Sequence, residues 1–291
     1  MSKVLIATEK PFAAPAVAGI KQILTEAGFE VVLLEKYTTK AELLAAVADV
    51  DAIIIRSDII DAEVFDAAKQ LKIVVRAGAG YDNVDLESAT AHGVCVMNTP
   101  GQNANAVAEL VFAMLLFGVR NRFNGTSGTE LKDKKLGLLA YGNTGRNVAR
   151  IAKGFGMDIY AYDPFTPAEV IEKEGVHAVA SQKELFSTCD IVSLHIPATP
   201  ETKGSIGREL VSLMPKKGIL VNTARKEVIN EPELIALLKE REDLRYFADI
   251  RPGAHEEFEA AAGDRYFSTP KKMGAQTSEA NTNAGLAAAR Q

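Results

Sequence analysis

Runs of consecutive hydrophobic residues alternate with helical patterns along the first hundred positions of the chain. The runs predict strands at residues 4–7, 31–34, 52–55, 73–75 and 94–97. Between them, apolar residues that recur every three or four positions predict helices at residues 15–27, 40–47, 62–68 and 86–91. Strands that are apolar throughout and separated by helices are typical of a parallel sheet covered on both faces.

A second series of the same kind begins at Leu136. It follows a long apolar helix predicted at residues 105–119 and a polar stretch at residues 121–135. Its predicted strands are residues 136–140, 159–162, 191–194, 219–221 and 246–248. The pattern therefore predicts an α/β protein with two doubly wound parallel-sheet domains joined by a helix.

Composition and charge narrow the function classes. Hydrophobic residues make up 47% of the chain and charged residues 24%, as in ordinary globular proteins. The 33 Lys and Arg against 38 Asp and Glu give a net charge of −5, so no nucleic-acid partner is expected. Cys95 and Cys189 lack metal-type spacing and indicate a reducing compartment. The N-terminal apolar run is too short for a signal peptide, and no apolar stretch approaches the ~18 residues of a membrane span. We expect a cytoplasmic protein with no membrane partner.

A strand-to-helix corner at residues 136–145 carries a nucleotide-binding signal. Backbone N–H groups at such a helix start hold a pyrophosphate. The residues at this turn are Gly142, Asn143, Thr144 and Gly145. Asp163 ends the second strand, where its carboxylate would bind the ribose hydroxyls and repel a 2′-phosphate, so NAD is expected rather than NADP. Ala140 replaces the first glycine of the usual pattern, which the turn tolerates if Ala140 keeps a negative φ. The alternative is a strand–glycine–helix corner that binds nothing.

Four longer segments resemble the D-2-hydroxyacid dehydrogenases. They are residues 76–85 (RAGAGYDNVD), 96–110, 190–204 and 222–231 (NTARKEVINE). Within that family the chain is most similar to the branch of short phosphoglycerate dehydrogenases that lack regulatory domains. The resemblance implies NAD-dependent oxidation of 3-phosphoglycerate to 3-phosphohydroxypyruvate, the entry step of serine synthesis, by a homodimer formed through the NAD-binding domains.

The resemblance also implies a division of the chain. Residues 1–98 together with 270–291 would form a flavodoxin-like substrate-binding domain, and residues 99–269 a Rossmann NAD-binding domain.

The catalytic residues of the family are an arginine, a glutamate and a histidine. Arg225 matches the arginine, which would clamp the substrate carboxylate and C2 oxygen. No histidine stands at the third position; aligning the Gly-Ala pair that follows puts Lys272 there, with Lys271 as the other register. The glutamate position falls on Ala254, and its loss fits a lysine acid/base, because a carboxylate would keep the amine charged. A branch of the short phosphoglycerate dehydrogenases shows the same replacement. We expect the site to lower the pKa of this amine from ~10.4 toward ~7–8.

The resemblance assigns two further groups of residues. The implied substrate contacts are Arg56, Ser57, Arg76, Ala77, Gly78 and Asn103. The arginines suit a phosphate and a carboxylate, and the Ala77 and Gly78 N–H groups would also face the carboxylate. The implied cofactor contacts are His195, Pro197, Thr202, Thr223, Ala224, Asp249, Gly274 and Ala275. For His195 we expect packing beside the cofactor, with proton transfer as the alternative. For Asp249 we expect a contact to the nicotinamide carboxamide, with a helix or turn cap as the alternative.

The sequence is compatible with two other functions. A reductase of glyoxylate, hydroxypyruvate or another small 2-oxo acid would need fewer cations than Arg56 and Arg76 supply. A non-catalytic NAD-sensing protein would explain the missing histidine and glutamate. Arg225 together with a lysine at the acid/base position argues against it.

Overall fold

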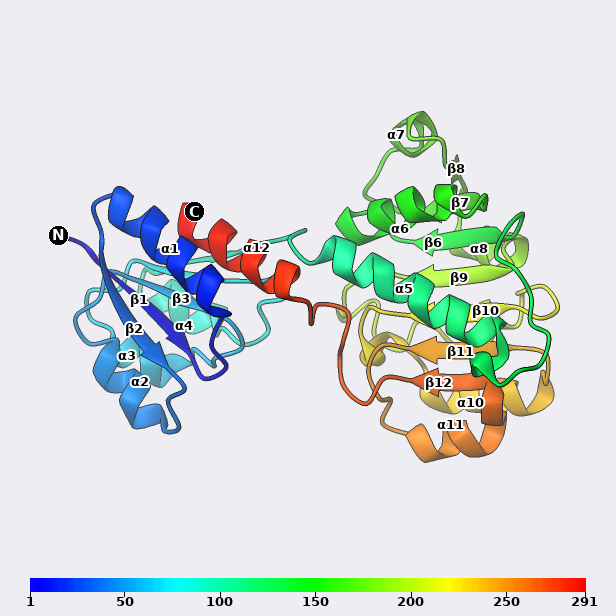
Figure 1. The fold of residues 1–291 in the computed structure, drawn as a ribbon. Helices are drawn as coiled ribbons and strands as arrows, with labels where there is room; N and C mark the ends of the chain where they lie inside the picture. Colours follow the sequence, from blue (N-terminus) through cyan, green and yellow to red (C-terminus); the bar gives the residue numbers. More distant parts are fainter. The chain divides into compact units, whose positions relative to one another are not determined.

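The computed structural model describes all 291 residues and divides into two compact units. Unit 1 comprises Met1–Asn103 and Gln276–Gln291, and unit 2 comprises Ala104–Ala275. Each unit is an α/β structure around one purely parallel sheet (Figure 1), which confirms the predicted fold class. None of the helices combines the length and the apolar character that a membrane crossing requires.

Both unit boundaries lie a few residues after the predicted ones at 98/99 and 269/270. Thr99 stays in unit 1, where its N–H donates to the Gly78 carbonyl at 2.9 Å. The segment after residue 269 stays in unit 2, because Met273 and Gly274 donate their N–H groups to the Asp249 carboxylate. Hydrogen bonds thus extend unit 1 beyond residue 98 and unit 2 beyond residue 269, past the ends of the apolar pattern.

Unit 1 is built on a five-stranded sheet in the order β2-β1-β3-β4-β5, the order of flavodoxin-like folds. Its strands are β1 (Lys3–Thr8), β2 (Glu30–Glu35), β3 (Ala52–Ile55), β4 (Ile73–Arg76) and β5 (Cys95–Asn98). Its helices are α1 (Ala14–Glu26), α2 (Lys40–Ala46), α3 (Ala62–Ala67), α4 (Leu86–Ala91) and α12 (Ser278–Arg290). Side chains of α1 and α12 form the core on one face, and those of α2, α3 and α4 form the core on the other.

The last helix belongs to the first unit because it packs along the first helix. In Figure 1, α12 (red) lies beside α1 (blue), although the two are at opposite ends of the sequence. A Cβ at Gly19 would come within 2.6 Å of Leu286, and a Cβ at Gly285 within 2.8 Å of Ile20. Glycine on each helix therefore permits the close approach.

Unit 2 is built on a seven-stranded sheet in the order β12-β11-β10-β9-β6-β7-β8. Its strands are β6 (Lys135–Leu139), β7 (Asp158–Tyr162), β8 (His177–Ala178), β9 (Ile191–Leu194), β10 (Ile219–Asn222), β11 (Arg245–Ala248) and β12 (Tyr266–Ser268). Its helices are α5 (Ala104–Val119), α6 (Asn143–Gly154), α7 (Ala168–Lys173), α8 (Gln182–Thr188), α9 (Arg208–Val211), α10 (Glu231–Glu240) and α11 (His255–Ala262). The order reverses at β6 and β9, which is the switch point where doubly wound sheets bind dinucleotides.

The edge strands β8 and β12 extend the sheet beyond the five predicted strands. They are two and three residues long, too short to show as a hydrophobic run. The helices α5 and α6 contribute to the core on one face of this sheet, and α8, α10 and α11 to the core on the other.

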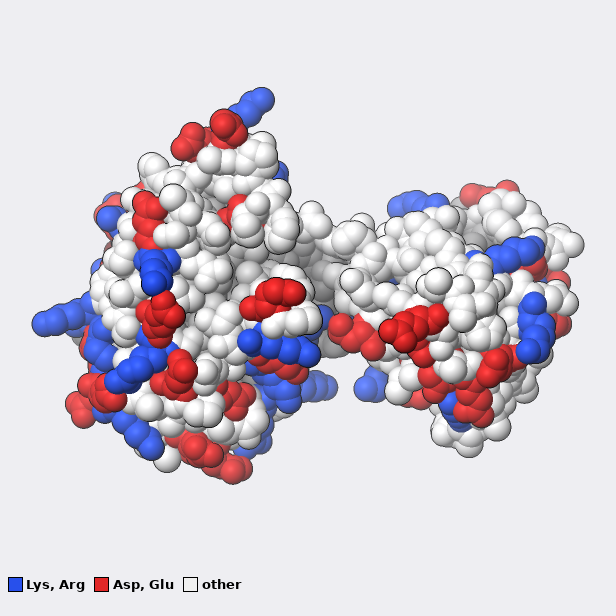
Figure 2. Space-filling view, turned by 180° about the vertical axis from the view of Figure 1, so that it is seen from behind, with Lys and Arg blue, Asp and Glu red and all other residues white.

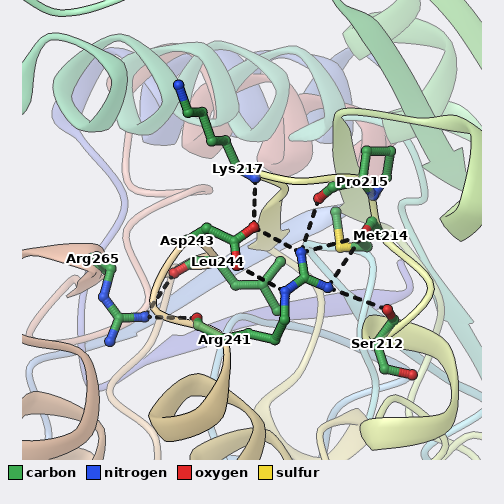
Figure 3. A network of polar contacts seen from close by, with 8 residues as sticks. All are labelled: Ser212, Met214, Pro215, Lys217, Arg241, Asp243, Leu244 and Arg265. Carbon is green, nitrogen blue, oxygen red and sulfur yellow. Dashed lines mark hydrogen bonds and ion pairs between the residues drawn. The ribbon is translucent and has the colours of Figure 1, made fainter.

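A cluster of guanidinium contacts ties together the chain segments that lead into β10 and β11 (Figure 3). Arg241 donates to both carboxylate oxygens of Asp243 at 2.8 and 2.7 Å. Its NH groups also reach the carbonyls of Ser212, Met214 and Pro215. Arg265 donates in turn to the carbonyls of Arg241 and Leu244. The ends of α9 and α10 and the start of β11 are thereby held at one point.

Charged side chains of both signs share the surface. On the face drawn in Figure 2, Lys and Arg lie among Asp and Glu over unit 2, and no stripe of one sign crosses this unit. This distribution agrees with the small net charge of −5.

Candidate active site

The turn between β6 and α6 carries two glycines that serve different purposes. Gly142 is the N-cap of α6, has an ordinary φ of −81°, and has nothing within 4 Å of where a Cβ would lie. The fold itself therefore does not require glycine there, and the open space suits close approach of a ligand's phosphates. A Cβ at Gly145 would lie 2.4 Å from the Ala140 carbonyl oxygen, so glycine is needed there for helix–strand packing. Asn143 and Thr144 form the first turn of α6.

Ala140 departs from the expectation of a negative φ. Its φ is +80°, in the left-handed region that glycine adopts without cost. A left-handed alanine costs roughly 1–2 kcal/mol. The close approach of Gly145 to the Ala140 carbonyl fixes the direction of that peptide group. The turn thus keeps the positive φ that glycine would adopt at position 140, although the residue is an alanine.

Asp163 follows β7, and its carboxylate faces the glycine turn. It accepts from the Tyr141 N–H at 2.8 Å and from the Phe165 N–H at 2.8 Å, one bond to each oxygen. Thr166 Oγ1 also donates to it at 3.2 Å. Since two carboxylate oxygens offer about four acceptor positions, Asp163 retains capacity for a ribose hydroxyl.

Polar groups at the carboxyl ends of β9 and β10 are buried without a hydrogen-bond partner. His195 continues the ladder through its N–H to the Leu139 carbonyl (2.9 Å), while its Nε2 has no partner. Burial lowers the pKa of His195 to about 4, so the ring is neutral at physiological pH. Thr223 Oγ1 is likewise unpartnered. Since buried polar groups are normally paired, these atoms fit a site that contacts a polar ligand.

The loop after β9 is closed by one threonine. Thr202 Oγ1 donates to the Pro197 carbonyl at 2.5 Å and accepts from the Thr199 N–H at 2.7 Å. Its hydroxyl therefore holds the loop that follows His195.

Asn222 shapes the turn that carries Arg225. Its side chain is 1% exposed; Oδ1 accepts from the Ala224 N–H at 3.0 Å and Nδ2 donates to the Arg225 carbonyl at 2.9 Å. Lys272 Nζ donates to the Ala224 carbonyl at 3.2 Å, and Arg225 NH1 to the same oxygen at 3.3 Å. The structure therefore brings Arg225 and Lys272 together. Lys271 has an exposed side chain, which favours the Lys272 register.

Asp249 holds the segment that carries Lys272. It is 1% exposed and accepts from Thr269 Oγ1 at 2.9 Å, from the Met273 N–H at 2.7 Å and from the Gly274 N–H at 2.8 Å. With these bonds the Asp249 carboxylate caps the turn at residues 269–274. This is the role expected of it if it does not contact the nicotinamide. A Cβ at Gly274 would lie 2.9 Å from the Asp249 carboxylate, so this position needs glycine; Ala275 is the last residue of the unit.

Ala254, the position to which the resemblance assigns the family's glutamate, is the N-cap of α11. The nearest carboxylate contact to its backbone comes from Glu231, which accepts from the Ala254 N–H at 2.7 Å and from the Gly253 N–H at 3.0 Å. Sequence reasoning missed the structural roles of Asn222 and Glu231. Both lie within the quoted segment 222–231, and an asparagine directly after an apolar strand is a known turn signal.

The implied substrate residues of unit 1 lie at the carboxyl ends of its strands. Arg56 NH1 donates to the Lys10 and Pro11 carbonyls, both at 2.9 Å, and its NH2 to Asn281 Oδ1 at 2.5 Å. Its guanidinium also lies over the Phe12 ring, 5.2 Å from the centroid. Much of its hydrogen-bonding capacity is thus used within the unit. Burial lowers the pKa of Arg56 from its usual value.

The backbone N–H groups expected to face a carboxylate are already bonded. The Ala77 N–H donates to the Ile55 carbonyl and the Gly78 N–H to the Arg76 carbonyl, each at 2.8 Å. Gly78 has a φ of +154°, and a Cβ there would collide with Arg76 NH1 at 1.5 Å. The Arg76 guanidinium is the end of a flexible side chain and could move, so it is the positive φ that favours glycine at this position. Ser57 is exposed after β3, and Asn103 is partly buried before α5.

Sequence and structure comparisons identify relatives. The model of the D-isomer specific 2-hydroxyacid dehydrogenase NAD-binding domain matches residues 116–263. The chain is 38% identical over 275 residues to D-3-phosphoglycerate dehydrogenase of Methanocaldococcus jannaschii, covering 87% of this chain and 51% of that protein. It is 34% identical over 278 residues to hydroxypyruvate reductase of Thermotoga maritima, covering 88% of each. It thus spans about half the length of the first of these relatives.

A solved structure resembles the whole chain. It is the NAD⁺-bound 3-phosphoglycerate dehydrogenase of Entamoeba histolytica, with 48% identity and a TM-score of 0.88, covering 100% of this chain and 93% of that one. The open turn at Gly142 and the unpartnered atoms of His195 and Thr223 fit a dinucleotide, and the cofactor is NAD. The chain belongs to the NAD-dependent D-isomer specific 2-hydroxyacid dehydrogenases.

Proposed function

We propose that the chain oxidises the C2 hydroxyl of 3-phosphoglycerate to give 3-phosphohydroxypyruvate, the entry step of serine synthesis. The observation that carries the proposal is the pairing of Arg225 and Lys272 at the Ala224 carbonyl. The names of the Entamoeba and Methanocaldococcus relatives support the choice of substrate.

Arg225 binds the substrate carboxylate and the C2 oxygen in this proposal. A guanidinium remains charged and presents a planar fork of donors, which matches a carboxylate and a neighbouring oxygen. The Asn222 bonds on either side of Ala224 fix the turn, so the arginine is held ready for the substrate.

Lys272 accepts the C2 hydroxyl proton in this proposal. An amine can do so only when uncharged, and the guanidinium beside it disfavours the protonated form. Position 254 holds an alanine and so adds no carboxylate of its own. NAD, when bound, supplies the acceptor for the hydride that leaves C2. Asp249 holds the backbone on the C-terminal side of Lys272 and so limits where the amine can lie.

Reduction of a small 2-oxo acid is the second candidate. It is favoured by the Thermotoga relative, whose name is hydroxypyruvate reductase, and by the protein acceptors that already occupy the Arg56 guanidinium. A phosphorylated substrate would draw on Arg56 and Arg76, whereas an unphosphorylated one would need them less.

The test is a substrate panel under matched conditions. NADH formation is measured with 3-phosphoglycerate, D-glycerate and D-lactate, and NADH consumption with hydroxypyruvate and glyoxylate. The proposal expects the highest kcat/KM in its direction for 3-phosphoglycerate. A higher value for D-glycerate, with hydroxypyruvate reduced efficiently, would instead support the second candidate.

By the same resemblance we propose a cytoplasmic homodimer formed through the NAD-binding domains. Light scattering after size-exclusion chromatography would then give twice the chain mass of 31.2 kDa.

A further inference from the structure

Tyr141, the residue between Ala140 and Gly142, is held at each of its three polar groups. Its N–H donates to Asp163 Oδ2 at 2.8 Å. Its carbonyl accepts from Arg146 Nε at 3.2 Å. Its hydroxyl donates to Glu174 Oε2 at 3.0 Å. The backbone of the dinucleotide turn is thereby fixed immediately before the N-terminus of α6.

Glu174 connects Tyr141 to α6, the helix that follows Tyr141 in the sequence. The carboxylate accepts from Tyr141 through one oxygen and pairs with Arg146 through the other. The Arg146 guanidinium lies over the Tyr141 ring, 5.2 Å from its centroid. Tyr141 is 1% exposed, and burial raises the pKa of its hydroxyl to about 12, so the hydroxyl remains a donor over the working range.

The turn needs such restraint because of the strain at Ala140. An alanine at a φ of +80° gains free energy by rotating to negative φ, where its Cβ no longer crowds the backbone. That rotation would turn the following peptide group and pull the Tyr141 N–H away from Asp163. It would also move the Ala140 carbonyl that packs against Gly145. The relaxed turn would no longer present the helix N-terminus to a pyrophosphate in the observed geometry.

We propose that Tyr141, Glu174 and Arg146 are positioning residues that hold the pyrophosphate-binding turn in its NAD-binding conformation against the strain at Ala140. If only a fraction of molecules has the competent turn, the apparent Kd for the cofactor rises by the inverse of that fraction. In this chain the three side chains therefore replace part of what a glycine at position 140 would supply.

The test is the affinity for NADH, followed by the emission of NADH itself, since the chain contains no Trp whose fluorescence could report binding. Tyr141→Phe removes one hydrogen bond and should raise the Kd about three- to tenfold. Glu174→Gln, at a partly exposed position, should raise it also and serves as a second variant if Tyr141→Phe folds poorly.

Tyr160→Phe is the matched control. Tyr160 also donates its hydroxyl to a carboxylate, that of Asp158 at 2.9 Å, but it lies on β7 and does not touch the turn. Its Kd for NADH should stay within twofold of the unmodified protein. Equal weakening by both Tyr→Phe variants would overturn the proposal, because general loosening of the unit would then explain the loss.

Rescue by glycine separates positioning from a purely structural role. Ala140→Gly removes the strain, so the double variant Ala140→Gly with Tyr141→Phe should bind NADH within about twofold of the unmodified protein. The melting temperature of the double variant need not recover for this result. A Tyr141→Phe variant with unchanged Kd, or a double variant that binds as weakly as Tyr141→Phe alone, would overturn the proposal.

Discussion

Lys272 and Arg225 donate to one acceptor, the backbone carbonyl oxygen of Ala224, from distances of 3.2 and 3.3 Å. The backbone segment that carries each of these two side chains is held in place by hydrogen bonds to a buried polar side chain. Asn222 fixes the turn of Arg225, and Asp249 fixes the turn of Lys272. The Asp249 N–H in turn donates to the Asn222 carbonyl at 2.8 Å, so the two supports are joined at the ends of neighbouring strands.

Replacement of Lys272 by alanine tests the proposed proton acceptor. Loss of a general base reduces rate by ~10²–10⁴, so kcat for Lys272→Ala should fall within that range. The NADH Kd should change little, because the glycine turn and Asp163 are untouched. Steady-state kinetics and NADH titration of the same preparation provide the measurement.

Lys271→Ala is the control for the register. Lys271 has an exposed side chain and contributes its carbonyl to Thr269 Oγ1, a bond that alanine preserves. Its kcat should remain within about threefold of the unmodified enzyme. A large loss in Lys271→Ala with little loss in Lys272→Ala would show that the register is wrong by one position.

The selectivity for NAD over NADP should depend on the charge of Asp163. Asp163→Asn keeps an oxygen that can accept from the Tyr141 N–H but removes the charge that repels a 2′-phosphate. The ratio of the Kd for NADP to the Kd for NAD should therefore decrease. Asp163→Ala should in addition weaken the binding of NAD itself. Equal affinity of the unmodified protein for NAD and NADP would contradict the assignment of Asp163.

The repeating strands and the glycine turn could be predicted because they depend on local pattern. Buried parallel strands must be apolar throughout, and helix N-termini that bind pyrophosphate need small residues at fixed spacing. These signals located both sheets and placed Gly142 and Gly145 in the right turn.

The conformation of Ala140 could not be predicted in the same way. Its positive φ is imposed by partners distant in sequence, such as Glu174 acting through Tyr141. The bonds of Arg56 to Asn281 depend on α12 returning to unit 1, which the apolar pattern does not encode. The geometry of such positions is set by tertiary contacts and leaves no signal in the local sequence pattern.

Arg56 should contribute to stability as well as to any substrate contact. Arg56→Ala removes bonds to two carbonyls and to Asn281, which should cost about 1–3 kcal/mol in the free energy of unfolding. If it also binds phosphate, its KM for 3-phosphoglycerate should rise ~10- to 100-fold, and that for D-glycerate much less.

Asn281→Ala separates the two effects. It removes one acceptor of Arg56 but leaves the guanidinium in place. Stability should fall modestly while KM stays near the original value. An unchanged KM for 3-phosphoglycerate in Arg56→Ala would mean that Arg56 is purely structural and would favour the unphosphorylated substrate.

His195 should make the stability of the protein sensitive to pH. Burial lowers its pKa from 6.5 to about 4, so between these values the unfolded chain binds a proton that the folded protein does not. The free energy of unfolding should therefore fall as the pH decreases from 6.5 to 4. Urea unfolding at several pH values should show a shallower dependence for His195→Gln.

Replacement of Arg241 should lower stability more than replacement of most partly exposed arginines or lysines. Its guanidinium binds several carbonyls and a carboxylate at the same time (Figure 3). Arg241→Ala leaves the Asp243 carboxylate with the Lys217 N–H as a donor but removes the charged donor from it and from several carbonyls, at a cost of about 1–3 kcal/mol given the partial exposure of the pair. Arg208→Ala breaks a more exposed pair with Glu240 and should cost less than ~1 kcal/mol.

The pH dependence of the Arg241→Ala effect identifies its source. The Arg241 hydrogen bond holds the pKa of Asp243 well below its usual range. A lowered carboxyl pKa stabilises the fold above the unfolded value of ~3.9, and this contribution is lost as the pH falls below it. The difference in unfolding free energy between the unmodified protein and Arg241→Ala should therefore be largest near pH 7 and shrink below about pH 4. A difference that stays constant over this range, measured by urea unfolding, would assign the whole effect to the carbonyl contacts instead.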